Sequence, residues 1–520
     1  MHGAVAAGHP LTAEAGAQAL EAGGNAVDAC LAAAFVSWVA ESPLTGPGGG
    51  GFLLVHRAGE RDAQLLDFFV TIPGRGLSSS APRGEMESID VVFGAGSTTQ
   101  VFHIGHAACA VPGTFAGLES AHRAYATLPW RDLVQPAVDL ARNGIELTPA
   151  QAYLHAILDV ILRSHDEGRE VYSLGGSRLA AGDRLVLTDL AATLERIADE
   201  GSRTFYRGEL GRAVAEHVRG GGGTLTEEDL RAYRVVRRRP VRVEFDGHEF
   251  LSNPPPSSGG VLIGYGLRLL DRLPQGEASA AEAMAEVVEV MREQARVRDA
   301  RFAEDLYRGG LARRLYRECA VAAALARMGR SEPRTESAAS PNTTHISVVD
   351  RQGNAASLTA SIGSGSGVVV PGTGIHLNNM LGEYDLNPPG ATQRAGLRLT
   401  SMMAPSLALA GGRPRLVVGS AGSVRLRGAI LQVAVNVLRH GMPVEEAIAH
   451  PRLHADAEHV HVEGGADRAE VDGLAALGYD IVRWRRRNLF FGGVAAVELA
   501  PDGSLRAAGD PRRGGHGVVV

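Results

Sequence analysis

The sequence predicts a mixed α/β fold in which layers of helices cover a core of β-sheet. Apolar residues at helical spacing run through residues 12–39 and recur from about residue 114 to residue 314. Alternation of apolar and polar residues, the pattern of half-buried strands, occurs at residues 240–252 and resumes at residues 343–361, and a helical pattern returns at 426–440. A chain that passes from helices to strands and back to helices is typical of helical layers packed on a sheet.

The first helical stretch, residues 12–39, is interrupted at Gly23-Gly24-Asn25 and leads into a run of glycines at residues 46–51. The glycines predict a tight loop that feeds a strand beginning near Phe52. A phosphate-binding loop is the alternative, but the run carries no lysine and does not enter a helix as such loops do. Asp28, at the start of the second half of the helical stretch, is expected to be a cap or ion-pair residue.

The central part of the chain is predicted to be mostly helical. Residues 240–252 alternate like a strand, and the three prolines that follow at 254–256 require a fixed loop. Six segments show amphipathic helical spacing: residues 116–128, 133–143, 150–164, 188–200, 208–219 and 280–314.

A small, polar segment at residues 329–342 has the composition of an exposed flexible linker. Immediately after it, Thr344, Ile346 and Val348 alternate with more polar neighbours, and residues 350–354 form a turn before a second strand at 355–361. This pattern predicts a β-hairpin. Further strands are expected at 367–370, 406–410 and 414–418, with a glycine turn at 419–422 before the helix at 426–440.

Length and charge limit the classes of function. With 520 residues, 45% of them hydrophobic, the chain can bury a large core, as two to four domain-sized units or as one layered fold. Its 58 acidic and 52 basic residues leave a net charge of −6, which argues against nucleic acid or an anionic membrane as a partner. The sequence contains no lysine, which excludes a P-loop lysine, a Schiff-base lysine and a Ser–Lys dyad.

No cofactor or metal site is expected. Cys30, Cys109 and Cys319 are too few and too scattered for a disulfide framework or a zinc cluster, and we expect buried free thiols. His450 and His454 have the spacing of a helical metal pair, but Pro451 disfavours helical geometry at His450. The N-terminus lacks a basic region followed by an apolar run, and no apolar run of about 18 residues occurs, so a cytoplasmic protein is expected.

The residues around the linker raise a chemical possibility. A threonine hydroxyl is a poor nucleophile near pH 7 and needs a base within hydrogen-bond reach. If the bond between Asn342 and Thr343 were cut, the new α-amino group of Thr343 could take the proton of its own hydroxyl. Spacing alone does not favour this interpretation, because most Thr-Thr strands are structural. His345, on the same face, is expected to support the strand.

The stretch from Thr343 to Asn354, TTHISVVDRQGN, resembles the start of the small subunit in the γ-glutamyltransferase family of N-terminal-nucleophile hydrolases. Other segments resemble the same family in the same order and span nearly the whole chain. They are Gly23 to Ala29, Gly48 to Phe52, Val111 to Thr114, Leu225 to Leu230, Pro254 to Gly260, Leu377 to Asn379, Gly419 to Gly422 and Asp510 to Arg512.

This resemblance implies an αββα sandwich formed by one precursor. It further implies autocatalytic cleavage between Asn342 and Thr343, giving a large subunit, residues 1–342, and a small subunit, residues 343–520, that remain associated. Thr343 would be the nucleophile, and Ser361 the hydroxyl residue that hydrogen-bonds it. Gly422 and Ser423 match the family's oxyanion hole, where fixed N–H donors face the developing charge.

The resemblance fails at the residues that recognise the substrate. Phe69 stands where family members that handle γ-glutamyl groups have an arginine for the substrate α-carboxylate. A carboxylate buried without a cationic partner costs several kcal/mol, so we expect a rebuilt, more hydrophobic acyl pocket. The other family substrate-binding positions are occupied by Gly363, Met380, Ser401 and Met402, with Glu383 keeping the carboxylate that binds the α-ammonium group.

Three functions remain open. The first is a self-processing hydrolase or acyltransferase for a small amino-acid-derived metabolite with an apolar part, in antibiotic metabolism, where some relatives cleave a carbon–carbon bond. The second is a conventional γ-glutamyltransferase that uses another arginine, with candidates Arg394, Arg398 and Arg425. The third is a non-catalytic binding protein. The partners expected are a small-molecule substrate and the two subunits of one precursor.

Overall fold

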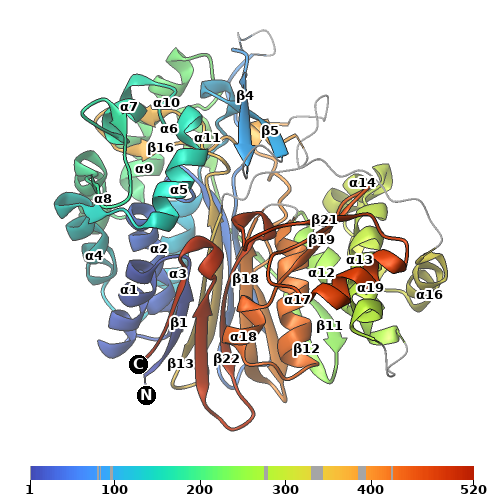
Figure 1. Cartoon of the computed structure of the whole chain (residues 1–520). Coiled ribbons are helices and arrows are strands. Elements are labelled where there is room, and N and C mark those ends of the chain that lie inside the picture. The colour runs from blue at the N-terminus through green and yellow to red at the C-terminus, as the bar shows by residue number, and fades with distance from the viewer. Residues whose placement is uncertain are drawn as a thin grey trace.

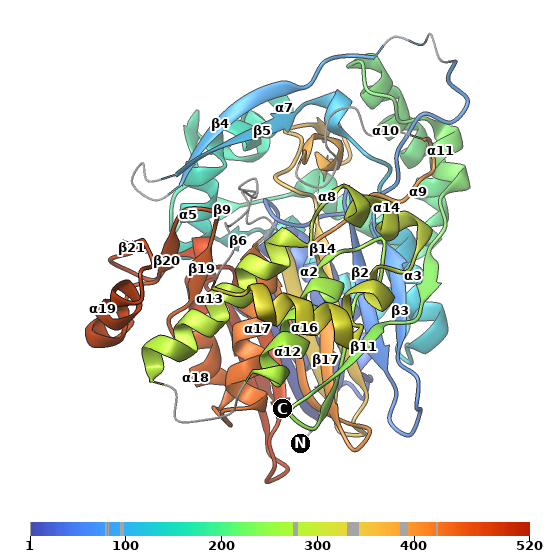
Figure 2. The same cartoon turned by 90° about the vertical axis from the view of Figure 1, so that its right-hand side faces the viewer.

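Two antiparallel sheets lie face to face between two layers of helices, which makes the fold an αββα sandwich (Figure 1, Figure 2). The computed structural model describes residues 2–78, 81, 83–93, 98–273, 279–329, 343–384, 394–422 and 425–520. The αββα architecture implied by the family resemblance is therefore confirmed.

The first sheet has seven strands, all paired antiparallel, and it carries the predicted hairpin at its centre. In spatial order its strands are β10 (Val236–Arg238), β3 (Gln64–Phe68), β2 (Gly50–His56), β14 (Ala355–Ser361), β13 (Thr344–Asp350), β1 (Gly3–Ala7) and β24 (His516–Val519).

The second sheet has six antiparallel strands and packs on the first. Its strands are β11 (Val241–Phe245), β12 (His248–Ser252), β17 (Ser406–Ala410), β18 (Arg413–Ala421), β22 (Gly493–Leu499) and β23 (Leu505–Gly509). The predicted strand at 240–252 is instead the hairpin β11–β12, since Asp246 and Gly247 both have positive φ, of 49° and 75°, and turn the chain back.

Alternation along the strands divides the apolar residues among the layers. In β13, Val348 belongs to the core beneath the first helical layer, whereas its neighbour Val349 belongs to the core between the two sheets. Ala7 and Ala6 in β1 are divided in the same way. A period of two therefore fills two separate cores from one strand.

The helix α2 (Ala26–Ala40) is buried along its whole length, because it lies between the first sheet and outer helices and its sequence is apolar on every side. Asn25 and Asp28 form a capping box at its start, which confirms the expected role of Asp28. The same layer contains α1 (Pro10–Glu21), α3 (Thr114–Tyr125), α4 (Trp130–Asn143), α5 (Pro149–Ile157), α6 (Asp159–Leu162), α7 (Asp166–Val171), α8 (Thr188–Glu200), α9 (Arg203–Arg207), α10 (Glu209–Gly220) and α11 (Glu227–Ala232).

The second helical layer covers the six-stranded sheet. The long helix predicted at 280–314 is divided into three, since the chain leaves helical geometry after Arg296 and again at Gly309-Gly310, where both φ angles are positive. The helices are α12 (Gly259–Arg272), α13 (Ala280–Arg296), α14 (Ala300–Arg308), α15 (Leu311–Leu315), α16 (Glu318–Arg327), α17 (Arg425–Leu438), α18 (Val444–Ala449) and α19 (Arg468–Ala476).

Short elements complete the sandwich, mainly above the strand ends (Figure 1). They are the ribbon β4 (Glu87–Phe93) and β5 (Thr98–Ile104), the pairs β6 (Ile145–Glu146) with β9 (Arg184–Leu185), β7 (Ser173–Leu174) with β8 (Ser177–Arg178) and β15 (Val369–Val370) with β16 (Ile375–His376), the small sheet β19 (Leu453–Ala455), β20 (Val460–Val462) and β21 (Ile481–Arg483), and the 3₁₀ turns η1 (His106–Ala108), η2 (Met380–Gly382), η3 (Leu489–Phe491) and η4 (Pro511–Arg513).

The three cysteines differ in burial. Cys30 and Cys109 are buried free thiols as expected, but Cys319 is exposed, which corrects the expectation for that residue.

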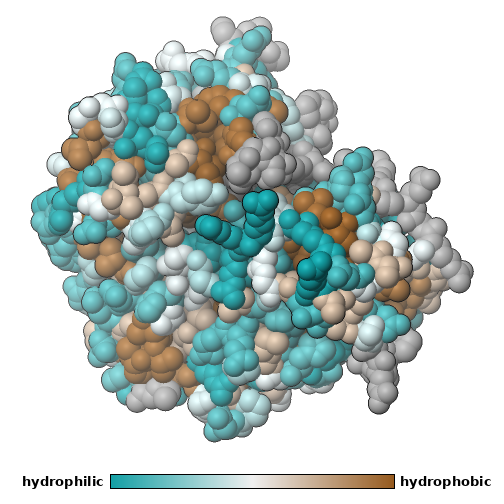
Figure 3. Space-filling model, in the orientation of Figure 1, coloured by the Kyte–Doolittle hydropathy of each residue, from teal (hydrophilic) through white to brown (hydrophobic). Residues whose placement is uncertain are grey.

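On the face shown in Figure 3, hydrophobic patches are separated by broad hydrophilic areas. Among the described residues, no helix combines the length and the apolar character needed to cross a bilayer.

Candidate active site

The heads of β13 and β14 bring Thr343 and Ser361 together. Thr344 is paired with Ala360 and Ser361 with Gly50, so Thr343 lies beside Ser361 at one end of the first sheet. Both side chains are buried, and the Ser361 hydroxyl accepts a hydrogen bond of 2.8 Å from the N–H of Gly363. The register is the one that a hydrogen bond from Ser361 to the nucleophile would need; the bond itself stays a prediction.

Two charged side chains from distant parts of the chain hold this strand end. Arg513, in η4, donates from Nη1 to the carbonyl oxygen of Thr343 at 2.9 Å. Glu41, just after α2, accepts from the hydroxyl of Thr344 at 2.6 Å and from that of Thr12 at 3.0 Å. The residue after the predicted cleavage site is thus fixed through both its own backbone and its neighbour's side chain.

Burial dominates the electrostatics of these two groups. It raises the pKa of the Glu41 carboxyl, against the lowering effect of the Thr344 and Thr12 hydrogen bonds and of the Arg513 charge. It lowers the pKa of Arg513 to about 10, against the opposing charges of Glu41 and Asp510. Arg513 therefore keeps its positive charge at neutral pH.

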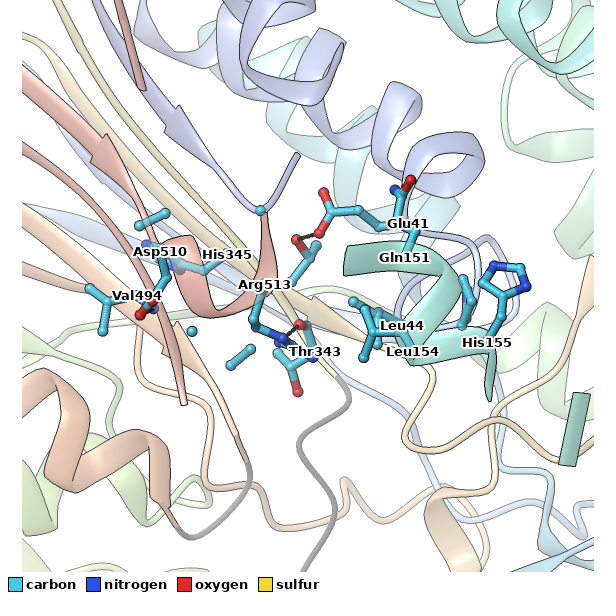
Figure 4. A pocket seen from close by; sticks show the side chains of 16 residues that line it. Glu41, Leu44, Gln151, Leu154, His155, Thr343, His345, Val494, Asp510 and Arg513 are labelled. Atoms are coloured by element: carbon cyan, nitrogen blue, oxygen red, sulfur yellow. Dashed lines mark hydrogen bonds between the residues drawn. The ribbon is translucent and has the colours of Figure 1, made fainter. Parts of the chain in front are cut away.

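A small cavity lies against Thr343 (Figure 4). Its volume of about 20 Å³ suits something the size of a water molecule, far below the several hundred Å³ of a typical ligand site. The lining includes Glu41, Gln151 and His155 from the first helical layer and Arg513 from the C-terminal segment. None of the residues predicted to bind substrate lines it.

His345 is tied into the sheet through both ring nitrogens. Nδ1 lies 2.8 Å from the hydroxyl of Thr359 and Nε2 lies 2.9 Å from that of Ser347. Burial lowers the pKa of His345 to about 3, so the ring is neutral near pH 7. This geometry agrees with the expected support role for the strand.

Of the two residues predicted to form the oxyanion hole, the structure describes Gly422. Strand β18 ends at Ala421, and Gly422 follows with a φ of 130°. Residues other than glycine rarely adopt this backbone conformation. A Cβ at Gly422 would lie 2.9 Å from the Cα of Gly492, so the two glycines pack closely. Ser423 and Asn342 lie outside the described residues.

Phe69 lies at the same end of the first sheet as Thr343. Gly50, opposite Ser361, is also next to the backbone of Phe69, which puts Phe69 three strand spacings, about 14 Å, from Thr343. The Phe69 ring is buried and stacks on Phe52, with centroids 5.4 Å apart. Both rings belong to the core between the sheets.

The other apolar candidates are divided between two cores. Met380 is buried in the same core as Phe69, whereas Met402 packs into the core beneath the second helical layer, with its sulfur 3.2 Å from the hydroxyl of Ser258. Met403 instead joins Phe69 and Met380. The hydroxyl of Ser401 accepts from the N–H of Met403 at 3.0 Å.

Glu383 and Gly363 are neighbours. A Cβ at Gly363 would lie 2.8 Å from the Glu383 carboxylate and 2.1 Å from the amide oxygen of Asn379. The carboxylate therefore lies close to the loop that follows Ser361. The φ of Gly363 is 69°, in the left-handed region.

The three alternative arginines are differently placed. Arg398 is buried, forms an ion pair of 3.2 Å with Asp67, and donates to the hydroxyl of Tyr233 and to the carbonyl oxygen of Phe69. Arg425 is buried with its guanidinium 4.3 Å from the centre of the Phe490 ring. Arg394 is exposed.

The histidine pair considered as a metal site does not share a helix. His450 caps the end of α18 with a ψ of 139°, as Pro451 predicted, and His454 lies in β19. In the part of the chain that the structure describes, no three His, Cys, Asp or Glu side chains come together as a metal site would require.

Sequence reasoning missed Glu41 and Arg513. Glu41 carried a weak signal, an acidic residue directly after a mostly apolar helix, and Arg513 directly follows the recognised stretch Asp510 to Arg512. Neither of these local signals indicates that the two residues meet at Thr343. They lie some four hundred and seventy positions apart in the sequence, and only the folded chain brings them together.

Comparison with known proteins agrees with this geometry. A family model described as gamma-glutamyltranspeptidase matches residues 12–520. The chain is 34% identical to the acylase ACY 1 proenzyme of Pseudomonas sp. (strain SE83), covering 100% of this chain and 93% of that protein. It is 30% identical to the glutathione hydrolase proenzyme of Escherichia coli (strain K12), covering 98% and 90%.

A solved structure, the cephalosporin acylase from Bacillus halodurans, superposes with a TM-score of 0.85 at 24% identity and covers 99% of this chain and 95% of that one. At this identity the likeness shows the fold. The family model and the relatives named proenzymes together identify the activity class. The chain belongs to the gamma-glutamyltranspeptidase family of self-processing N-terminal-nucleophile hydrolases and acyltransferases.

Proposed function

We propose that this member of the family acts on an apolar acyl group rather than on a γ-glutamyl group. Thr343 would be the nucleophile after cleavage of the Asn342–Thr343 bond, and the acyl group would be recognised by the apolar side of the site around Phe69. The substrate would be an amino-acid-derived intermediate of specialised, antibiotic metabolism.

The observation that carries the proposal is the environment of Phe69. The family's carboxylate-binding arginine is absent there, and the ring is stacked on Phe52 among apolar neighbours. Arg398, the alternative that lies nearest to Phe69, is already engaged by Asp67 and Tyr233. A substrate carboxylate at this position would have to break that ion pair or remain unpaired, and either costs several kcal/mol.

The reaction would take place at Thr343, at the start of β13. The Thr343 hydroxyl attacks the acyl carbon while its proton passes to the α-amino group of the same residue. The N–H of Gly422 would stabilise the negative oxygen. Collapse breaks the bond to the leaving group, which takes the proton from the ammonium, and leaves an acyl ester on Thr343. Water or an amine then releases the acyl group and restores the hydroxyl.

Two scissile bonds fit this scheme. With an amide, the leaving group is an amine, and the relative named acylase ACY 1 proenzyme supports this alternative. With a carbon–carbon bond, the leaving carbon departs with the electron pair and takes the same proton, which requires a substrate that stabilises the carbanion. Product analysis by mass spectrometry would distinguish an amine product from a C–H product.

A pair of chromogenic substrates tests the proposal. We expect release of p-nitroaniline from phenylacetyl-p-nitroanilide and roughly a thousandfold less from γ-glutamyl-p-nitroanilide, since a missing charge partner costs several kcal/mol. Thr343→Ala is the blank for both. Robust release from the γ-glutamyl compound would contradict the apolar pocket.

One observation favours a second candidate, a conventional glutathione hydrolase. Glu383 retains the carboxylate that binds an α-ammonium group in the family, and it lies beside Gly363, close to Ser361. Preference for the γ-glutamyl substrate would select this alternative. A denaturing gel with a single full-length band after maturation would instead indicate a non-catalytic binding protein.

A further inference from the structure

Glu41 is a buried carboxylate that none of the steps above uses. It is 4% exposed and lies at the C-terminal end of α2, in the part of the chain that becomes the large subunit. Its two oxygens accept from Thr344 in β13 and from Thr12 in α1. It therefore joins the first helical layer to the strand that begins with the nucleophile.

Arg513 approaches the same strand end from the C-terminal segment. Its guanidinium donates to the carbonyl oxygen of Thr343, and its charge acts on Glu41. Figure 4 shows Glu41 and Arg513 converging on the start of β13 from different elements, with Thr343 at the edge of the cavity that all three line.

We propose that Glu41 is a positioning residue for Thr343, acting through the hydroxyl of Thr344 and the guanidinium of Arg513. Cleavage before Thr343 turns an internal residue into a chain end, and chain ends fray unless they are tied down. The contacts of Glu41 and Arg513 lie on the C-terminal side of the cut, so both survive it. They keep the hydroxyl and the new amino group of Thr343 in one orientation before and after processing.

The choice of a carboxylate has a physical reason. A hydrogen bond to an ionised acceptor is roughly twice as strong as one between neutral groups, and a carboxylate accepts from two hydroxyls at once. Burial raises the pKa of this carboxyl, and the positive charge of Arg513 acts against that rise. One side chain thereby fixes Thr344 and keeps Arg513 aimed at Thr343.

Self-cleavage needs no substrate, so this inference rests on the family's processing and not on the proposed acyl group. The rate of conversion of the full-length precursor into two bands tests it directly. We expect Glu41→Gln, which keeps the shape but removes the charge, to slow processing about ten- to a hundredfold, the cost of weakening a charged hydrogen bond.

Glu498→Gln is the matched control. Glu498 is also buried, at 2% exposed, pairs with one arginine, Arg415, at 2.7 Å and accepts one backbone N–H. Glu498 itself does not line the cavity; the lining residues of β22 are Gly493, Val494 and Ala495, three or more positions before it. We expect Glu498→Gln to lower the melting temperature as much as Glu41→Gln while processing stays within about twofold of wild type. Equal slowing in both variants would overturn the proposal, because it would show a general loss of stability.

A double-mutant cycle tests the route through Thr344. Thr344→Val is nearly isosteric and removes the donor to Glu41. If Glu41 acts through Thr344, adding Glu41→Gln to Thr344→Val slows processing by a smaller factor than Glu41→Gln does alone. Independent, multiplying effects would overturn this route.

The processed enzyme gives a second readout. Mature Glu41→Gln should show a lower kcat with KM within about twofold of wild type, because Glu41 lies behind the nucleophile and away from the predicted acyl pocket. Unchanged processing together with unchanged kcat would overturn the proposal. If Glu41→Gln does not fold, Thr344→Val alone decides: processing at the wild-type rate would contradict the inference.

Discussion

Two groups of buried residues at the same end of the sandwich, here called corners, differ in chemistry: one is polar and the other is apolar. The nucleophile corner (Thr343, Thr344, Ser361, Glu41 and Arg513) is buried and polar, and hydrogen bonds in it join segments that are distant in sequence. The recognition corner (Phe52, Phe69, Met380 and Met403) is buried and apolar. In sequence, the first resembles the family at Thr343 and Ser361, and the second departs from it at Phe69 and Met380.

The difference shows which part of such a site can change. A polar corner is linked by directional bonds, so loss of one partner leaves another buried group unsatisfied. An apolar corner is held by packing, which tolerates exchange of side chains of similar volume. Under the proposed function, substrate preference would therefore be rebuilt around Phe69 while the chemistry proposed for Thr343 is retained.

The largest expected effect comes from removing the nucleophile. Thr343→Ala should abolish processing and lower turnover by roughly a thousandfold or more, whereas Thr343→Ser should retain part of both, because a hydroxyl remains. Intact-mass spectrometry of the purified protein and a turnover assay measure the two. Processing of the alanine variant at the wild-type rate would show that Thr343 is not the nucleophile, and the contrast between a reactive and a recognising corner would then be wrong.

The recognition corner should respond in specificity. Phe69→Ala removes a fully buried ring and should lower the free energy of unfolding by about 3–5 kcal/mol, measured by urea denaturation. Phe245→Ala, in the core beneath the second helical layer, should cost a similar amount. Only Phe69→Ala should reduce the ratio of kcat/KM for phenylacetyl- over γ-glutamyl-p-nitroanilide. An unchanged ratio would show that Phe69 does not contribute to substrate recognition.

Acid should destabilise β13, the strand that starts at the polar corner and contains His345. The folded-state pKa of His345, about 3, lies below its ordinary 6.5, so the unfolded chain takes up the proton first as pH falls. The contribution to stability is complete above pH 6.5 and decreases toward pH 3, by about 1.4 kcal/mol per pH unit. Between pH 7 and pH 5 the wild type should lose about 2 kcal/mol more than His345→Gln in urea denaturation. Equal losses would contradict this assignment.

The smallest effect is expected at the border between the corners. In Gly363→Asn the new Cβ would lie 2.1 Å from the Asn379 amide oxygen, and we expect a loss of about 1–2 kcal/mol in thermal unfolding. Gly372→Asn is the control, because its φ of 68° is the same and no atom lies within 4 Å of its Cβ position. A similar loss in both would mean that backbone conformation, and not the contact, decides.

Local patterns in the sequence predicted the elements whose signals are complete within a few residues. The hairpin of β13 and β14 and the capping box at Asn25 and Asp28 are examples. Failures arose where a short feature interrupts a longer pattern, as at Asp246-Gly247, or where a glycine-rich segment precedes a helix, as at α12.

The candidate site was predictable only in part. The position of Thr343 follows from the linker, the strand and the family resemblance. The division of Met402 and Met403 between two cores could not be predicted, because both lie in the irregular segment before β17, where no strand or helix period applies. Glu41 and Arg513 could not be placed, because their meeting depends on the packing of both ends of the chain.

The strand order has a consequence for the processed protein. In the first sheet, β13, β14 and β24 come from residues after Thr343, and β14 and β13 are inserted between β2 and β1 from residues before it. Cleavage before Thr343, as proposed, would leave the two products sharing backbone hydrogen bonds along both sides of one hairpin, and neither could keep its part of this sheet alone. Dilution should not release them from each other, and their dissociation should coincide with denaturation.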